Sequence, residues 1–72
     1  MNPFKQVLET VPKEETPVTL PYLDKVRSIM ESGNISLPLY ADIITVLEFL
    51  SDAGALELRS EETGRFYIKR RT

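Results

Sequence analysis

The chain has 72 residues and a formal net charge of −2, and it contains neither cysteine nor histidine. This length provides one domain with a small core, and the composition excludes disulfides, thiolate metal sites and a histidine general base. No apolar run approaches the ~18 residues that cross a bilayer and no secretory signal is visible, so we expect a cytoplasmic domain without a membrane partner, which the lack of cysteine also favours.

The first predicted element is a short helix over residues 2–11. Asn2 can cap this helix, and Pro3 suits its first turn. The apolar side chains follow the helical period and form one stripe, made of Phe4, Val7, Leu8 and Val11. Residues 12–18 are polar and bounded by two prolines, so they predict a loop.

A second helix is predicted over residues 20–32, with Pro21 in its first turn. Its apolar side chains also recur with the helical period, and they are Tyr22, Leu23, Val26, Ile29 and Met30. We expect Gly33 and Asn34 to end this helix, because glycine tolerates the left-handed conformation that closes many helices.

The third helix is predicted over residues 37–53, with Pro38 in its first turn. Its wide apolar sector consists of Leu39, Ile43, Val46, Leu47 and Leu50, and is widened by Tyr40 and Ile44. The opposite stripe consists of Asp42, Thr45, Glu48 and Asp52, with Phe49 at its edge. So wide an apolar sector indicates a central helix that is covered on more than one side. We expect the residues at its centre to be nearly inaccessible, namely Ile43, Leu47 and Leu50.

Residues 55–71 change to a period of two, which predicts a β-hairpin. Its strands are expected over residues 56–60 and 65–70, and Gly64 suits the left-handed position of a three-residue loop. One register brings opposite charges together twice on the outer face, which favours it over its neighbours. This register pairs Glu61 with Arg65, Arg59 with Tyr67 and Glu57 with Lys69 on the outer face, and Leu58 with Ile68 and Ser60 with Phe66 on the inner face.

Three helices followed by a β-hairpin resemble the winged helix-turn-helix superfamily, over roughly residues 20–71. The resemblance is carried by Leu39–Leu50, by the junction SDAGAL at residues 51–56 and by the hairpin Leu56–Arg70. It implies an α+β, winged-helix-like fold in which the C-terminal two-stranded hairpin is the wing. One departure is the segment between the second and third helices, which lacks the usual sharp turn signature.

Catalysis is not expected from this composition. Nucleophilic chemistry has no activating histidine or cysteine, and the paired carboxylates Glu14–Glu15 and Glu61–Glu62 stand in polar loops where they stay hydrated. The glycines are scattered, so they form no phosphate-binding loop, and the acidic residues lack the close spacing of a calcium site. We therefore predict no catalytic residue, no metal site, no cofactor and no small-molecule substrate.

Nucleic acid is the first candidate partner, in a regulatory role. Helix-turn-helix proteins read the major groove with the third helix, but here residues 38–58 contain no lysine or arginine and would present carboxylates to phosphates. The C-terminal segment is basic instead. Its candidate nucleic-acid contacts are Arg59, Arg65, Tyr67, Lys69, Arg70 and Arg71. Arg59, Arg65 and Lys69 can alternatively pair with Glu57 and Glu61. Arg70 and Arg71 have no evident partner.

A protein is the alternative partner, in an adaptor or in a homodimer. The interface would be the acidic stripe of the third helix, with residues Asp42, Thr45, Glu48, Phe49 and Asp52. Phe49 would act as an aromatic anchor, or else pack under the wing or the first helix as part of the core. The resemblance favours a DNA-binding regulator, whereas the charge of the third helix favours the adaptor.

Overall fold

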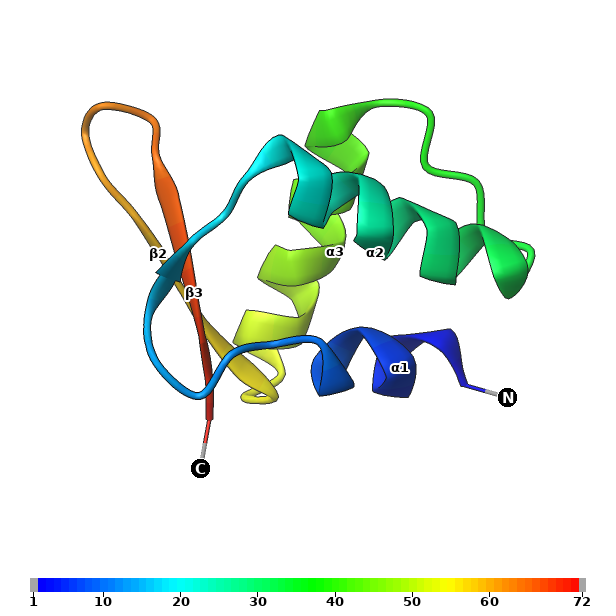
Figure 1. Cartoon of the computed structure of the whole chain (residues 1–72), viewed down its shortest axis with the longest axis horizontal. Helices are drawn as coiled ribbons and strands as arrows, with labels where there is room; N and C mark the ends of the chain where they lie inside the picture. The colour runs from blue at the N-terminus through cyan, green and yellow to red at the C-terminus, as the bar shows by residue number, and fades with distance from the viewer. Residues whose placement is uncertain (1, 72) are drawn as a thin grey trace.

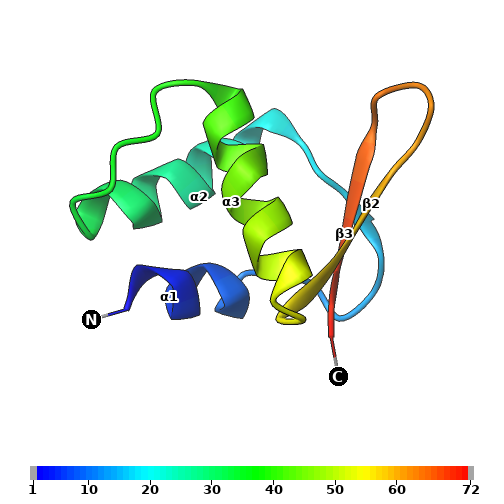
Figure 2. The same ribbon diagram turned by 180° about the vertical axis from the view of Figure 1, so that it is seen from behind.

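The computed structural model describes residues 2–71, and it shows an α+β domain with three helices and a three-stranded antiparallel sheet. The elements are α1 (Pro3–Glu9), β1 (Thr16–Pro17), α2 (Leu20–Ser32), α3 (Tyr40–Asp52), β2 (Leu56–Ser60) and β3 (Phe66–Arg70). The sheet stands at one end of the molecule, and α1 and α2 extend toward the other end (Figure 1). Figure 2 shows from behind how α3 lies beside the hairpin and crosses α2. None of the helices within residues 2–71 has the length and hydropathy to span a bilayer.

The first helix is capped as predicted but is shorter. The Asn2 side-chain oxygen accepts a hydrogen bond from the backbone N–H of Phe4 at 3.0 Å. The helix ends at Glu9 rather than at Val11. The following proline disfavours helical geometry for Val11, and the Thr10 hydroxyl donates to the carbonyl of Val7 at 2.6 Å, in the last turn.

The predicted loop over residues 12–18 contains the strand β1, so the prediction of a two-stranded sheet is wrong. β1 pairs with the edge of β3 opposite to β2, which gives the strand order β1-β3-β2. The N–H of Val18 donates to the carbonyl of Phe66 at 2.9 Å, and the N–H of Arg70 donates to the carbonyl of Pro12 at 2.6 Å. A strand of two residues is too short to show an alternating pattern, and it tolerates a proline because it lies at the edge of the sheet.

The second helix has the predicted bounds, but its end is built differently. Asn34 has the left-handed conformation, with φ of 65°, whereas φ of Gly33 is −96°. Gly33 provides space instead, since a Cβ atom there would lie 2.7 Å from Cγ of Pro3. Glycine at this position therefore lets the first turn of α1 approach the end of α2.

The third helix begins at Tyr40, and the segment predicted as its first turn is extended. Pro38 disfavours helical geometry for Leu37, and the carbonyl of Leu37 accepts a hydrogen bond from Arg27 at 2.9 Å. The N–H of Leu39 donates to the Asp42 carboxylate at 3.0 Å, which caps the helix. Leu39 is consequently 62% exposed rather than part of the apolar sector, and Leu37 is buried in its place.

The core is apolar and lies between α3, the other helices and the sheet. Its members are Val7, Val11, Leu23, Val26, Met30, Leu37, Ile43, Leu47, Leu50, Leu56 and Ile68. The expected burial of Ile43, Leu47 and Leu50 is confirmed. Each such side chain stabilises the fold by about 1.5–3 kcal/mol relative to exposure. α3 packs against both α2 and β2, so it is the central helix.

The hairpin has the predicted register. The pairs are Glu57 with Lys69, Leu58 with Ile68, Arg59 with Tyr67 and Ser60 with Phe66. The N–H of Glu61 donates to the carbonyl of Arg65 at 2.8 Å and closes the turn. Gly64 has φ of 88°, which confirms the left-handed position predicted for it.

The turn at Gly64 gives a test of this local structure. Gly64→Val should lower the free energy of unfolding by about 1–3 kcal/mol, because a β-branched residue resists positive φ. Gly64→Asn is the matched control and should cost less, since asparagine tolerates this conformation and the space around the position is open. Urea denaturation followed by circular dichroism measures both variants, and equal losses would contradict the assignment.

Candidate functional site

Arg59 is the centre of an ionic cluster on the outer face of the sheet, the face opposite to buried Ile68. Its guanidinium lies 4.4 Å from the centre of the Tyr67 ring. It binds the carboxylates of Glu15 at 2.7 Å and of Glu61 at 3.2 Å. Glu15 was not predicted as a partner, because the pairing of β1 with β3 that brings it here was not predicted either.

The cluster shifts the pKa of both members of its shortest pair. The hydrogen bonds from Arg59 lower the pKa of Glu15, burial opposes this shift, and the charges of Arg59 and Lys69 lower the pKa further. Hydrogen bonds to Glu15 and Glu61 raise the pKa of Arg59. Both groups are therefore ionised at neutral pH, and the charge of Arg59 is neutralised within the sheet.

Arg70 has a structural partner that the sequence did not reveal. Its Nε atom donates to the carbonyl of Val11 at 3.1 Å, and its Nη2 atom donates to the carbonyl of Glu9 at 3.3 Å. The Glu9 carbonyl is at the end of α1, where carbonyls lack partners within the helix and carry partial negative charge, and Val11 lies two residues beyond it. Arg70 therefore ties β3 to the end of α1.

The remaining predicted nucleic-acid contacts are exposed and dispersed. Arg65 lies in the hairpin loop, Lys69 faces Glu57 across the outer face, and Arg71 follows the end of β3. Within residues 2–71, no ion pair forms at any of these three side chains. Among the predicted contacts, the structure therefore stacks only Arg59 and Tyr67 on each other, and Arg59 is also bound to two carboxylates.

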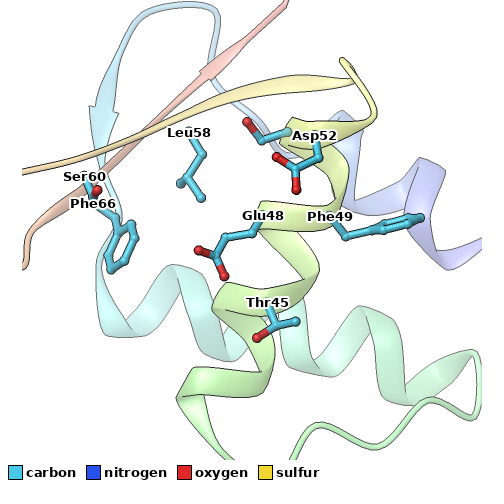
Figure 3. A pocket seen from close by; sticks show the side chains of 8 residues that line it. Thr45, Glu48, Phe49, Asp52, Leu58, Ser60 and Phe66 are labelled. Carbon is cyan, nitrogen blue, oxygen red and sulfur yellow. The ribbon is translucent and has the colours of Figure 1, made fainter.

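A groove of about 490 Å³ lies between α3 and the hairpin (Figure 3). Its lining residues are Thr45, Glu48, Phe49, Ser51 and Asp52 from α3 and Leu58, Ser60 and Phe66 from the hairpin. Glu48 and Asp52 are exposed, and Leu58 and Phe66 are half-buried. The groove thus combines an acidic wall with an apolar floor, and no lysine or arginine is among these lining residues.

Most of the predicted protein interface lines this groove, but two members behave differently. The Asp42 carboxylate caps α3 at Leu39 and lies outside the groove. Phe49 is 60% exposed, so it is not a core residue. Its ring is directed away from the hairpin in Figure 3, and its centre lies 6.1 Å from that of Phe4 in α1. Phe49 therefore stands at the rim, between the groove and α1.

Sequence reasoning missed the hairpin residues of the groove. Leu58, Ser60 and Phe66 were placed on the inner face of the hairpin, and this placement is correct. The exposure of Ser60 and the partial exposure of Leu58 and Phe66 were not foreseen, because they depend on how the hairpin stands relative to α3. Phe66 also lines a second groove, of about 640 Å³, which includes Ile44 and the hairpin loop around Gly64. The apolar floor therefore continues from one groove into the other.

No protein-family model matches this chain, and no curated protein or solved structure was found to be similar to it. Among residues 2–71, no group of three or more acidic side chains is arranged to hold a metal ion.

The different roles of neighbouring arginines predict different losses of stability. Arg70→Gln should lower the free energy of unfolding by about 1–2 kcal/mol, because two carbonyls lose charged donors. Arg71→Gln removes the same charge and should change stability by less than about 0.5 kcal/mol. Thermal and urea unfolding of the two variants measures the difference, and an equal effect would contradict the role assigned to Arg70.

The Glu15–Arg59 pair predicts a dependence of stability on pH. Since the pKa of Glu15 in the folded state lies below the unfolded value near 4.5, its contribution is present above that value and is lost as pH falls through the folded pKa. Arg59→Gln should return the Glu15 pKa toward 4.5 and flatten this part of the stability profile. Carboxyl NMR titration measures the pKa, and an unchanged value in the variant would contradict the pairing.

Proposed function

We propose that this chain is a winged-helix-like, non-enzymatic protein-interaction module, and that its partner binds the groove between α3 and the hairpin. The order of the elements supports the winged-helix part of the proposal. α3 leads through the short turn at residues 53–55 into β2, and the hairpin stands beside this helix (Figure 1).

The chemistry of the groove carries the choice of partner. Glu48 and Asp52 project from α3 next to the half-buried Leu58 and Phe66. Carboxylates repel the phosphates of nucleic acid, whereas a protein surface with apolar and basic side chains can satisfy both kinds of lining residue. The exposed ring of Phe49 adds an aromatic anchor at the rim.

Nucleic-acid binding through the hairpin and the tail is a second candidate, and it rests on three residues. Arg65, Lys69 and Arg71 are exposed, whereas Arg59 is neutralised by two carboxylates and Arg70 is bound to backbone carbonyls. A contact to phosphate by three dispersed charges would be weak and strongly dependent on salt.

Photo-crosslinking from the groove separates the two functions. A benzophenone amino acid in place of Thr45 should yield one discrete adduct in cells that express the chain. The same probe in place of Ser28, an exposed residue of α2, should yield none. The double variant Glu48→Lys, Asp52→Lys should abolish the Thr45 adduct, because it reverses the charge of the wall.

The nature of the adduct decides between protein and nucleic acid. We expect it to be resistant to nuclease and to be digested by protease. A nuclease-sensitive adduct, or adducts of equal yield from Thr45 and Ser28, would contradict the proposed function.

A further inference from the structure

The edge of β2 that faces away from β3 is open. Residues 2–71 supply no strand beside it, because the strand order is β1-β3-β2. The backbone hydrogen bonds of Phe66 and Arg70 go to the segment that contains β1. Successive residues of a strand bond to opposite sides, so Tyr67 and Lys69 of β3 bond to β2. In β2, Arg59 pairs with Tyr67 and bonds to β3, and its neighbours in the strand are Leu58 and Ser60. The N–H and C=O groups of Leu58 and Ser60 are therefore directed to the open edge.

This open edge and the acidic wall belong to the same groove. Leu58 and Ser60 line it from β2, and Glu48 and Asp52 line it from α3. A proline and a bulge, two of the devices that commonly prevent a further strand from pairing, are absent from this edge. A strand added here would place every second side chain on the α3 side, over the carboxylates.

The spacing of the acidic wall matches that of a strand. Glu48 and Asp52 are one helical turn apart, about 6 Å along α3, and side chains on one face of a strand repeat every ~6.7 Å. Two basic side chains at positions i and i+2 are spaced about as widely as the two carboxylates, and their long, flexible stems can reach α3, which diverges from β2 (Figure 3). Their aliphatic stems would cover Leu58, while their charged ends reach the acidic wall.

A second copy of the chain fits this edge less well. Pairing of two β2 strands about a two-fold axis would place both α3 helices on the same side of the extended sheet. The Glu48 and Asp52 side chains of the two copies would then face each other with like charge, which is unfavourable.

We propose that the module binds its partner by strand addition: an extended segment with lysine or arginine at alternate positions pairs with the β2 edge and places these side chains against Glu48 and Asp52. This inference rests on the proposed function and specifies its partner as a basic, extended peptide. Backbone hydrogen bonds would provide the affinity, and the alternating charges would provide the specificity.

A synthetic heptapeptide with alternating threonine and lysine tests the strand addition. Titration of the whole chain, followed by ¹⁵N NMR, should shift the amide signals of Leu58 and Ser60. At saturation, the hydrogen exchange of these two amides should slow by about tenfold or more, because they become hydrogen-bonded. A peptide with glutamate in place of lysine should not bind.

N-methylation separates strand pairing from simple charge attraction. The heptapeptide begins and ends with threonine, and only one edge of the added strand faces β2. N-methyl groups on the three lysines, or instead on the last three threonines, therefore block opposite edges. Binding should be lost with one set and kept with the other. Equal affinity of both methylated peptides, or loss with both, would overturn the proposal.

Matched variants test the acidic wall. Glu48→Gln combined with Asp52→Asn should weaken the lysine peptide by about tenfold at low salt. Glu31→Gln, at an exposed position of α2, removes a carboxylate elsewhere and should leave the affinity within about twofold. Equal weakening by both changes would overturn the role of the wall.

The outcomes also separate this inference from the proposed function. A protein adduct from Thr45, combined with no protection of Leu58 and Ser60 by the peptide, would refute strand addition and leave the groove as an interface. Protection of these amides without peptide, together with a dimer in light scattering, would refute the basic segment in favour of a second copy. Absence of both the adduct and the peptide complex would refute both proposals.

Discussion

Ile43 and Leu47 of α3 have no exposed surface, and α3 contacts both α2 and β2. The apolar side of this helix therefore serves as the common packing surface for the domain. The buried side chains of the other elements pack around it, and the net stability of a chain this small is a small difference between large terms. Because the apolar side is used in the core, only the polar side of α3 remains for contacts with other molecules. The chemistry of that side consequently determines which partners are compatible with the fold.

Periodic features of the chain were predictable, and features that depend on contacts between distant segments were not. The hairpin register followed from the alternation of side chains and from opposite charges across the strands. β1 was missed because its pairing is imposed by the free edge of β3 and not by its own residues. The start of α3 was misplaced because Arg27 and Asp42 hold the preceding segment extended, and the sequence shows neither contact in advance.

The candidate site shows the same limit. Glu48 and Asp52 were grouped correctly from their helical spacing, but the groove exists only because the hairpin stands beside α3. The basic residues were grouped by their proximity in sequence, and the structure gives them separate tasks. Arg59 stabilises the outer face of the sheet, and Arg70 joins two elements. A cluster of like charges in a sequence is therefore a weak guide to a common binding surface, because backbone carbonyls and distant carboxylates compete for each charge.

The hydrogen bonds of Arg70 to Val11 and Glu9 join residues that are 59 and 61 positions apart in the sequence. Contacts of such separation close large loops and form slowly when a chain folds. The helix that they hold has seven residues, which is too short to be stable in isolation. The order of α1 thus depends on the arrival of β3, and the two elements should gain and lose structure as one cooperative unit. A protease that cuts within β3 would release the first helix as well as the last strand.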